Sequence, residues 1–455
     1  MRDVVIVGGG AAGVNAAVIA ASSGCRVALV DSGPEPGGQY YRGGPTGRFA
    51  EMCERLAALE VSDRVELLFD HYAYALESTN DGFRARVRGD DRHRGDIQVL
   101  DAHAVVVATG AFDRQLPFPG WDLPGVMSGG AAQALIKGSG VLPGKRLAVA
   151  GTGPFLLAVA STILDAGGDL AAVIEANDPI SIARRVRSTM PVISKSGELA
   201  GYLATLARHR VPYLRRHRVT RAHGADHLES ITVSKVDADW CALPGTEREI
   251  EIDALAIGYG FTAQTDVLGA ARFARGADGG IAVAVDDRQE TSVRGLFAAG
   301  ETTGVGGVDL AAYEGLLAGA AAAEHCGMAP ALTARAETQA RRRVGDLRRF
   351  ADTLHATFPV REGWRDDVDN ATLVCRCEEV SAQQVRDAVR MGATDTRSVK
   401  LITRAGMGWC QGRVCGPIVD GLCGFDDLAS LVGAATRPVA APVPLGALAG
   451  QQVEG

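Results

Sequence analysis

The chain has 455 residues, a net charge of −7, 57 glycines and 47% hydrophobic residues. This length leaves room for about three domains, and the apolar content excludes an intrinsically disordered chain. The acidic balance, without a basic patch interleaved with aromatic residues, argues against nucleic acid as a partner.

The N-terminal segment predicts a dinucleotide-binding fold, with a strand at Asp3–Val7, a helix at about Ala11–Ser23 and a second strand at Arg26–Val30. Glycines between the first strand and the helix permit a tight turn and the approach of backbone N–H groups to a pyrophosphate. An acidic residue closes the second strand 18 residues after Gly13, where a carboxylate accepts hydrogen bonds from a ribose diol. The predicted nucleotide-binding residues are Gly8, Gly10, Ala11, Ala12, Gly13, Asp31 and Ser32.

After a Pro- and Gly-rich linker at 116–144, a second strand–turn–helix pattern begins at Arg146–Ala150. Its turn keeps Gly151 and Gly153, but Leu156 stands where the third glycine of the motif belongs, which implies a modified site. Glu175 ends the next strand and argues against NADP. NAD, another adenine nucleotide and an empty pocket all remain open for this second site.

Two uncharged stretches, Val4–Gly24 and Leu147–Leu164, have the length of membrane segments. A glycine turn interrupts each of them, so we predict strand, turn and helix, and no membrane span. Asp3 stands where a signal peptide would carry positive charge. Nine cysteines, four of them clustered, favour a reducing compartment, and we expect a cytoplasmic location.

Strands at Asp253–Ile257 and Gly295–Ala299 are expected to return to the first domain, so that one dinucleotide fold is inserted into the other. From Leu332 to Phe358, apolar residues recur every three or four positions, which predicts a long amphipathic helix. We expect Arg341–Arg343 to lie on its solvated face.

Four cysteines near the C-terminus are spaced as C-x-C, a gap of 32 residues and C-x4-C: Cys375, Cys377, Cys410 and Cys415. Four thiolates can hold a [2Fe–2S] cluster. Zinc sites usually have C-x2–4-C pairs, so the spacing favours the cluster over structural zinc, and two tight pairs disfavour unrelated buried thiols. Arg376 and Arg413, inside the two pairs, either offset the cluster charge or are simply exposed.

Further segments resemble the flavoprotein family with two dinucleotide domains, which includes thioredoxin reductase and ferredoxin reductases. They are Pro36–Gln39, Thr109–Gly110 and Phe297–Glu301. The resemblance implies FAD, bound also by Gly38, Gln39, Thr109, Gly110, Gly300 and Glu301, with Glu301 in place of the usual Asp. The chain has no C-x-x-C, and Cys25 and Cys53 lack a neighbouring cysteine in sequence, so disulfide reductase activity is not expected.

The cysteine segments Leu373–Val380 and Gly408–Pro417 resemble the bacterioferritin-associated-ferredoxin type of [2Fe–2S] domain. The whole chain is similar to the α or A subunit of heteromeric amino-acid dehydrogenases, such as proline and hydroxyproline dehydrogenases, opine oxidases and hydrogen cyanide synthase. This resemblance implies that the partner is a D-amino-acid-oxidase-like flavoprotein β subunit. A small ferredoxin-like subunit is a further candidate.

The expected fold is therefore α/β, with two nested dinucleotide-binding (Rossmann-like) domains and a small C-terminal [2Fe–2S] domain. The expected division is 1–115 with 254–325 for FAD, 116–253 for the linker and second nucleotide domain, 326–370 for a helical connector, 371–424 for the cluster and 425–455 for a tail. The expected function is an FAD-dependent oxidoreductase subunit that relays electrons in an amino- or imino-acid dehydrogenase. The alternative is a self-contained NADH-dependent reductase that feeds an external acceptor. No base–acid constellation identifies a catalytic residue.

Overall fold

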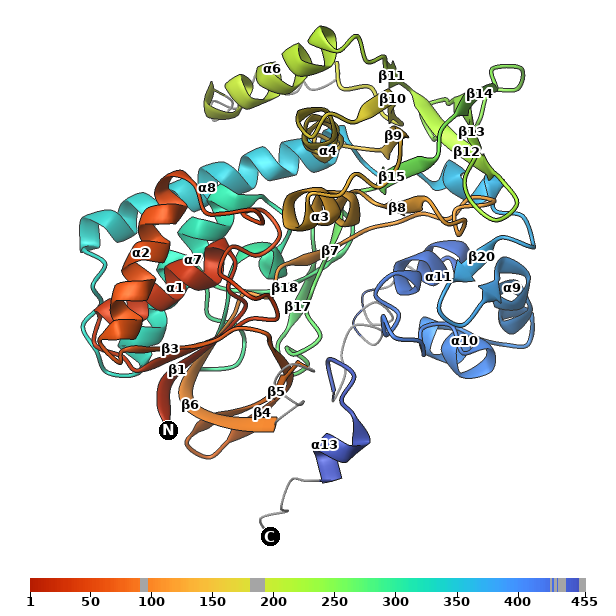
Figure 1. Cartoon of the computed structure of the whole chain (residues 1–455). Helices are drawn as coiled ribbons and strands as arrows, with labels where there is room; N and C mark the ends of the chain where they lie inside the picture. Colours follow the sequence, from red (N-terminus) through yellow and green to blue (C-terminus); the bar gives the residue numbers. More distant parts are fainter. Residues whose placement is uncertain (91–96, 181–192, 426–427, 429–431, 433–438, 450–455) are drawn as a thin grey trace. The chain divides into compact units, whose positions relative to one another are not determined.

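The computed structural model describes residues 1–90, 97–180, 193–425, 428, 432 and 439–449 (Figure 1). By their contacts these residues form two compact units. Unit 1 comprises Met1–Ala111, Ala263–Ala351 and Ala435–Gly455, and unit 2 comprises Phe112–Thr262 and Asp352–Ala434. Each unit therefore takes two or more separate segments of the chain, as a nested arrangement requires.

Unit 1 is built on one large sheet in the order β3-β2-β1-β6-β5-β4, with β19 also paired to β6. The strands β3, β2, β1, β6 and β19 are parallel, and β5 and β4 extend the sheet as an antiparallel hairpin. The strands are β1 (Arg2–Val7), β2 (Val27–Val30), β3 (Val65–Leu68), β4 (His71–Thr79), β5 (Gly82–Gly89), β6 (Ile97–Val107) and β19 (Leu296–Ala298). A small hairpin, β17 (Phe273–Arg275) and β18 (Ile281–Val283), lies in the same unit.

Helices α1 (Ala11–Ser22) and α7 (Val308–His325) pack against each other in the apolar core on one face of this sheet. Glycines on α7 permit a backbone-to-backbone approach, since a Cβ at Gly315 would lie 2.1 Å from the carbonyl oxygen of Ala12. Helix α1 is buried on nearly every side, which explains why its sequence is apolar without a polar face. The unit also contains α2 (Gly47–Val61), the 3-10 turn η4 (Gly300–Thr303) and the short helix α13 (Leu445–Ala449).

Unit 2 contains a parallel sheet in the order β11-β10-β9-β15-β8. We expected Asp253–Ile257 to return to the first domain, but β15 pairs with β9 and β8 and thus completes the second sheet. The predicted linker also contains a strand and a helix, β8 (Val126–Ser128) and α3 (Gly129–Ser139). The other elements here are β9 (Arg146–Gly151), α4 (Phe155–Asp165), β10 (Asp169–Glu175), α6 (Ile193–Arg208), β11 (Tyr213–Arg215) and β15 (Ala254–Gly258).

An antiparallel sheet and the cysteine segment share one apolar core with this parallel sheet. The antiparallel strands are β12 (His217–His223), β13 (Ser230–Lys235) and β14 (Arg248–Glu251). The cysteine segment contains η5 (Glu362–Asp367), β20 (Leu373–Cys375), β21 (Val380–Ser381), α9 (Ala382–Arg390), α10 (Thr396–Thr403) and α11 (Cys415–Cys423). Trp121 and Tyr259 of the nucleotide fold belong to the same buried cluster as Cys375 and Ile418. The cysteine domain therefore packs on the second dinucleotide fold without a separate core.

The predicted connector is the helix α8 (Ala334–Thr357), whose buried positions include Ala340 and Ala351. Arg342 and Arg343 are exposed as expected, whereas Arg341 makes ion pairs with Asp287 and Glu337. The pair β7 (Ala111–Asp113) and β16 (Phe261–Ala263) forms a further two-stranded sheet. The predicted tail, 425–455, lies in part outside the described residues. No helix among the described residues is long and apolar enough to span a bilayer.

Candidate flavin and iron–sulfur sites

The first glycine loop forms a cradle at the start of α1. A Cβ at Gly13 would lie 1.7 Å from the carbonyl oxygen of Gly8, so glycine here lets the helix begin directly against the loop. A Cβ at Gly10, in contrast, would meet no protein atom closer than the Cα of Gly38, at 3.9 Å. A Cβ at Gly10 would thus fit without a clash, and the loop lies at a helix N-terminus, which suits a pyrophosphate.

Asp31 fixes the end of β2 to this loop. Its carboxylate accepts hydrogen bonds from the backbone N–H of Gly9 at 2.5 Å and of Gly33 at 2.6 Å. Burial raises the pKa of Asp31, and these two N–H donors act in the opposite direction. The predicted residues Ser32 and Gln39 are exposed, whereas Gly38 lies against Gly10.

The second predicted flavin segment meets the end of β6. The backbone N–H of Gly110 donates to the hydroxyl of Thr302 at 3.2 Å, and Thr302 is fully buried in η4. Gly300, with φ of +78°, packs against the first turn of α1, since its Cβ would lie 3.0 Å from that of Ala12. The fold thus brings Gly10–Gly13, Thr109–Gly110 and Gly300–Glu301 to one end of the sheet. These residues fit an FAD molecule laid along this end, where they would hold the pyrophosphate and the ribityl chain.

A buried ion pair that the sequence did not single out lies under this segment. The carboxylate of Glu314, 1% exposed, accepts from the N–H of Gly300 at 2.9 Å, from the hydroxyl of Thr303 at 3.0 Å and from Arg348 at 2.6 Å. One signal was available, because Glu314 interrupts an otherwise apolar run in a helix that had to be buried.

The second glycine loop is closed by the protein itself. Glu175 is fully buried and accepts from the hydroxyl of Thr152 at 2.7 Å, the N–H of Gly153 at 2.8 Å and the N–H of Asn177 at 2.8 Å. The side chain of Asn177 donates in turn to Thr152 and to the carbonyl oxygen of Pro359. Burial raises the pKa of Glu175 to about 7 despite its three donors.

The two loops provide an internal comparison. Asp31 and Glu175 both accept backbone N–H groups from their glycine loops, but Asp31 retains partial exposure and Glu175 has none. The difference comes from the segment after α8. Asn177, which lies beside Glu175, donates a hydrogen bond to the carbonyl oxygen of Pro359 at 2.9 Å. Gly151, Gly153 and Glu175 are therefore brought together, and the carboxylate of Glu175 is bound by donors of the protein itself.

The four predicted cluster cysteines converge as two thiol pairs. The sulfurs of Cys377 and Cys410 lie 3.9 Å apart, and Cys375 is hydrogen-bonded to Cys415. Across the described residues no group of three or more His, Cys, Asp or Glu side chains is arranged to hold a metal ion. Two pairs fit a two-iron cluster, in which the protein supplies two ligands to each iron.

Hydrogen bonds from a neighbouring thiol and from the backbone favour the thiolate form of Cys375. The hydrogen bond from Cys415 lowers the pKa of Cys375 to about 5, with further contributions from the N–H groups of Gly406, Glu378 and Cys377. Gly406 and Gly408 allow this compact loop, since a Cβ at Gly408 would lie 2.2 Å from that of Cys377. Cys375 and Cys415 are buried, whereas Cys377 is exposed.

The two arginines within the cysteine pairs stack on aromatic rings. The guanidinium carbon of Arg376 lies 4.9 Å from the ring centroid of Trp121, and that of Arg413 lies 5.1 Å from that of Phe112. Trp121 also donates its indole N–H to the carbonyl oxygen of Leu373 at 2.7 Å. Both arginines therefore attach the cysteine loops to the second dinucleotide fold, a role that neither of the two sequence hypotheses included.

One thiol contact was not predicted from the sequence. Cys25 had no neighbouring cysteine in sequence, but the structure places it in a hydrogen bond with Cys326, whose Sγ donates to the carbonyl oxygen of Asp3 at 3.3 Å. The contact arises because Cys25 follows α1 and Cys326 ends α7, and these two helices pack side by side. It lies at the C-terminal ends of the helices, away from the glycine cradle at their N-terminal ends.

Taken together, these features define a flavoprotein oxidoreductase with two dinucleotide folds and an iron–sulfur domain. The family model of the pyridine nucleotide-disulphide oxidoreductases matches residues 2–337, and that of the BFD-like [2Fe–2S] binding domain matches residues 373–422. The chain belongs to the pyridine nucleotide-disulphide oxidoreductase family, and the expected fold class is confirmed.

Relatives over nearly the whole chain are named as subunits. An opine oxidase subunit from Agrobacterium tumefaciens (strain Ach5) is 30% identical over 447 residues, which cover 92% of this chain and 84% of that protein. Hydrogen cyanide synthase subunit HcnB from Pseudomonas aeruginosa is 30% identical over 427 residues, 90% of each chain. The structure of L-proline dehydrogenase from P. horikoshii shares the fold, with a TM-score of 0.70, 20% identity and coverage of 98% of this chain and 79% of that one. As the sequence predicted, the chain is a flavin and [2Fe–2S] oxidoreductase subunit.

Proposed function

We propose that this chain relays electrons in a heteromeric amino- or imino-acid dehydrogenase whose substrate is oxidised by a partner flavoprotein subunit. The observation that carries the proposal is the contrast between the two glycine loops. At the first loop Asp31 stays partly exposed, while at the second loop Glu175 is fully buried beside Asn177, which bonds Thr152 and Pro359. On this basis the flavin binds at the first loop and the cluster at the four cysteines, and NADH is not a substrate of the second loop.

At the flavin site, Gly10 and the N-terminus of α1 would bind the pyrophosphate, and Gly300–Glu301 would face the ribityl chain. Bound FAD accepts electron pairs, and a [2Fe–2S] cluster carries single electrons, so the two together convert one into the other. Cys375, Cys377, Cys410 and Cys415 would hold the cluster. Cys377 is exposed and marks the edge of the cluster site that lies nearest to solvent.

The partner would have the chemistry of a D-amino-acid-oxidase-like β subunit. Support comes from opine oxidase and hydrogen cyanide synthase, whose matching chains are named as subunits. Since all nine cysteines are free thiols in the structure, we also infer a reducing, cytoplasmic setting.

The test is steady-state dye reduction by the lone chain and by the chain co-expressed with its partner, with proline, hydroxyproline isomers, sarcosine, glycine and opines. We expect turnover only with the partner. Turnover by the lone chain at ordinary enzyme rates, about 1–1,000 per second, would contradict the partner requirement.

The alternative, a self-contained NADH-dependent reductase, is distinguished by a second measurement. NADH is added anaerobically to the lone chain, and the flavin absorbance is followed. We expect no bleaching, because Glu175 and its loop are already satisfied within the protein. Rapid bleaching would favour the alternative.

A further inference from the structure

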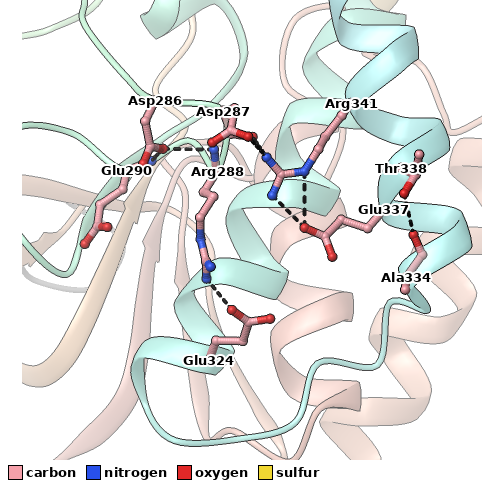
Figure 2. A network of polar contacts seen from close by, with 9 residues as sticks. All are labelled: Asp286, Asp287, Arg288, Glu290, Glu324, Ala334, Glu337, Thr338 and Arg341. Carbon is pink, nitrogen blue, oxygen red and sulfur yellow. Dashed lines mark hydrogen bonds and ion pairs between the residues drawn. The ribbon is translucent and has the colours of Figure 1, made fainter.

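Helix α7 carries two glutamates in ion pairs with arginine, and they differ sharply in burial. Glu324 pairs with Arg288 at the surface, where the two side chains are 38% and 44% exposed (Figure 2). Glu314 pairs with Arg348, and its side chain is 1% exposed. A buried carboxylate is costly to desolvate unless its geometry and hydrogen bonds compensate, so its placement calls for a specific explanation.

The buried pair holds both ends of η4. At one end, Glu314 accepts the backbone N–H of Gly300 at 2.9 Å. At the other end, Arg348 donates to the carbonyl oxygen of Gly304 at 2.8 Å. Between them, the hydroxyl of Thr303 donates to Glu314 and accepts from Arg348.

The opposite side of η4 faces the elements that would bind FAD. A Cβ placed on Gly300 would lie 3.0 Å from the Cβ of Ala12 at the start of α1. Thr302 accepts the N–H of Gly110. A shift of η4 would therefore move Gly300 and Glu301 relative to both other flavin segments.

From this geometry we propose that Glu314 and Arg348 are positioning residues for the flavin, which fix η4 so that Gly300–Glu301 meets the ribityl chain. Arg348 comes from α8, the helix that the sequence predicted only as a connector. The proposal rests on the proposed function, since it requires FAD at the first glycine loop.

The charges of Glu314 and Arg348 explain why the ion pair needs both residues. Burial raises the pKa of Glu314, and the charge of Arg348 opposes that rise. Removal of either partner leaves the other charge without its counter-charge, which is more damaging than removal of both. A lysine at 348 keeps the charge, but it lacks the fork that reaches Gly304, Thr303 and Glu314 at once.

The experiment compares Glu314→Gln, Arg348→Met, Arg348→Lys and the double variant Glu314→Gln/Arg348→Met with wild type, in the full chain. The matched control is Glu324→Gln, which makes the same change on the same helix in the exposed pair (Figure 2). FAD dissociation constants are measured by reconstitution of the apoprotein. The visible circular dichroism and the midpoint potential of the bound flavin report its position.

We expect each single variant to raise the FAD dissociation constant by about tenfold or more, equal to about 1.4 kcal/mol, and to alter the flavin circular dichroism. The double variant is expected to lose less FAD-binding free energy than the two single variants lose in sum. The FAD dissociation constant of Arg348→Lys should lie between those of wild type and Arg348→Met. Glu324→Gln should bind FAD as wild type does.

The proposal is overturned if Glu314→Gln and Arg348→Met bind FAD within about twofold of wild type, with an unchanged flavin spectrum. If Glu314→Gln fails to fold by far-ultraviolet circular dichroism, Arg348→Met and Thr303→Val decide the question by the same two readouts. Absence of FAD from wild type itself would instead contradict the proposed function.

Discussion

The stability of unit 2 should depend on pH through Glu175. This carboxyl group is fully buried, and burial raises its pKa from 4.5 to about 7 in the folded chain. The folded state therefore binds the Glu175 proton more tightly than the unfolded state does. The contribution of this group to the free energy of unfolding is largest below pH 4.5 and is lost as the pH rises through 7.

The size of the effect follows from the shift. The rise in the pKa of Glu175 from 4.5 to about 7 corresponds to about 3 kcal/mol between the two pH limits. Most of this contribution to the free energy of unfolding should be lost between pH 5 and pH 8. The loss belongs to the sealed second loop, because Thr152, Asn177 and Pro359 exclude the water that would stabilise the charged form.

The assay uses urea unfolding followed by tryptophan fluorescence. The four tryptophans of the chain, Trp121, Trp240, Trp364 and Trp409, all lie in unit 2, so this signal reports on that unit alone. The free energy of unfolding is measured from pH 5 to pH 8 for wild type and for Glu175→Gln, which cannot ionise. Glu251→Gln, an exposed position on β14, serves as the matched control.

From pH 5 to pH 8, we expect the free energy of unfolding of Glu175→Gln to rise relative to that of wild type by about 2–3 kcal/mol. The absolute stability of the variant is reduced at low pH, since its amide nitrogen would face the N–H of Gly153. Glu251→Gln should follow the wild-type slope. Parallel curves for wild type and Glu175→Gln would refute the argument, because they would show that Glu175 is already ionised at pH 5.

Three further predictions test the sites. Gly10→Val should abolish FAD binding with little loss of stability, because a Cβ there would come no closer than 3.9 Å to a protein atom, whereas Gly13→Ala should destabilise unit 1 itself. Flavin content and thermal melting separate the two variants, and normal flavin content in Gly10→Val would show that the site is elsewhere. Cys375→Ser or Cys410→Ser should lose iron and acid-labile sulfide but keep FAD, since all four thiols lie in unit 2 and the glycine cradle lies in unit 1. Joint loss of flavin and iron would argue against this separation. Arg376→Gln should reduce the stability of the cysteine loop by about 0.5–2 kcal/mol, because the stack on Trp121 is lost. We expect faster loss of iron to a chelator. Equal rates in wild type and variant would mean that the stack contributes nothing.

The local sequence pattern was sufficient to predict many of the structural elements of this protein. Strand, glycine turn and helix follow one another within 20 residues, so the sequence at Val4–Ser23 carries its own evidence for a dinucleotide fold. The cysteine spacing also predicted which four thiols act together, but Cys377 meets Cys410 and Cys375 meets Cys415, so the two cysteine loops are brought together by the tertiary structure. The amphipathic connector also follows from a local period, and α8 matches it.

Pairing between distant segments was decided only by the tertiary structure. The strand β15 is a short apolar run that would suit the edge of either sheet, and nothing in its composition specifies that β9 and β8 are its neighbours. The same limit applies to Glu314 and Arg348, which are 34 residues apart and meet only because α7 and α8 pack near η4. The sequence left the second glycine loop open to NAD, to another nucleotide or to none. Burial of Glu175 behind Pro359, which is 184 residues further along the chain, is a property of packing, and packing is what closes that loop.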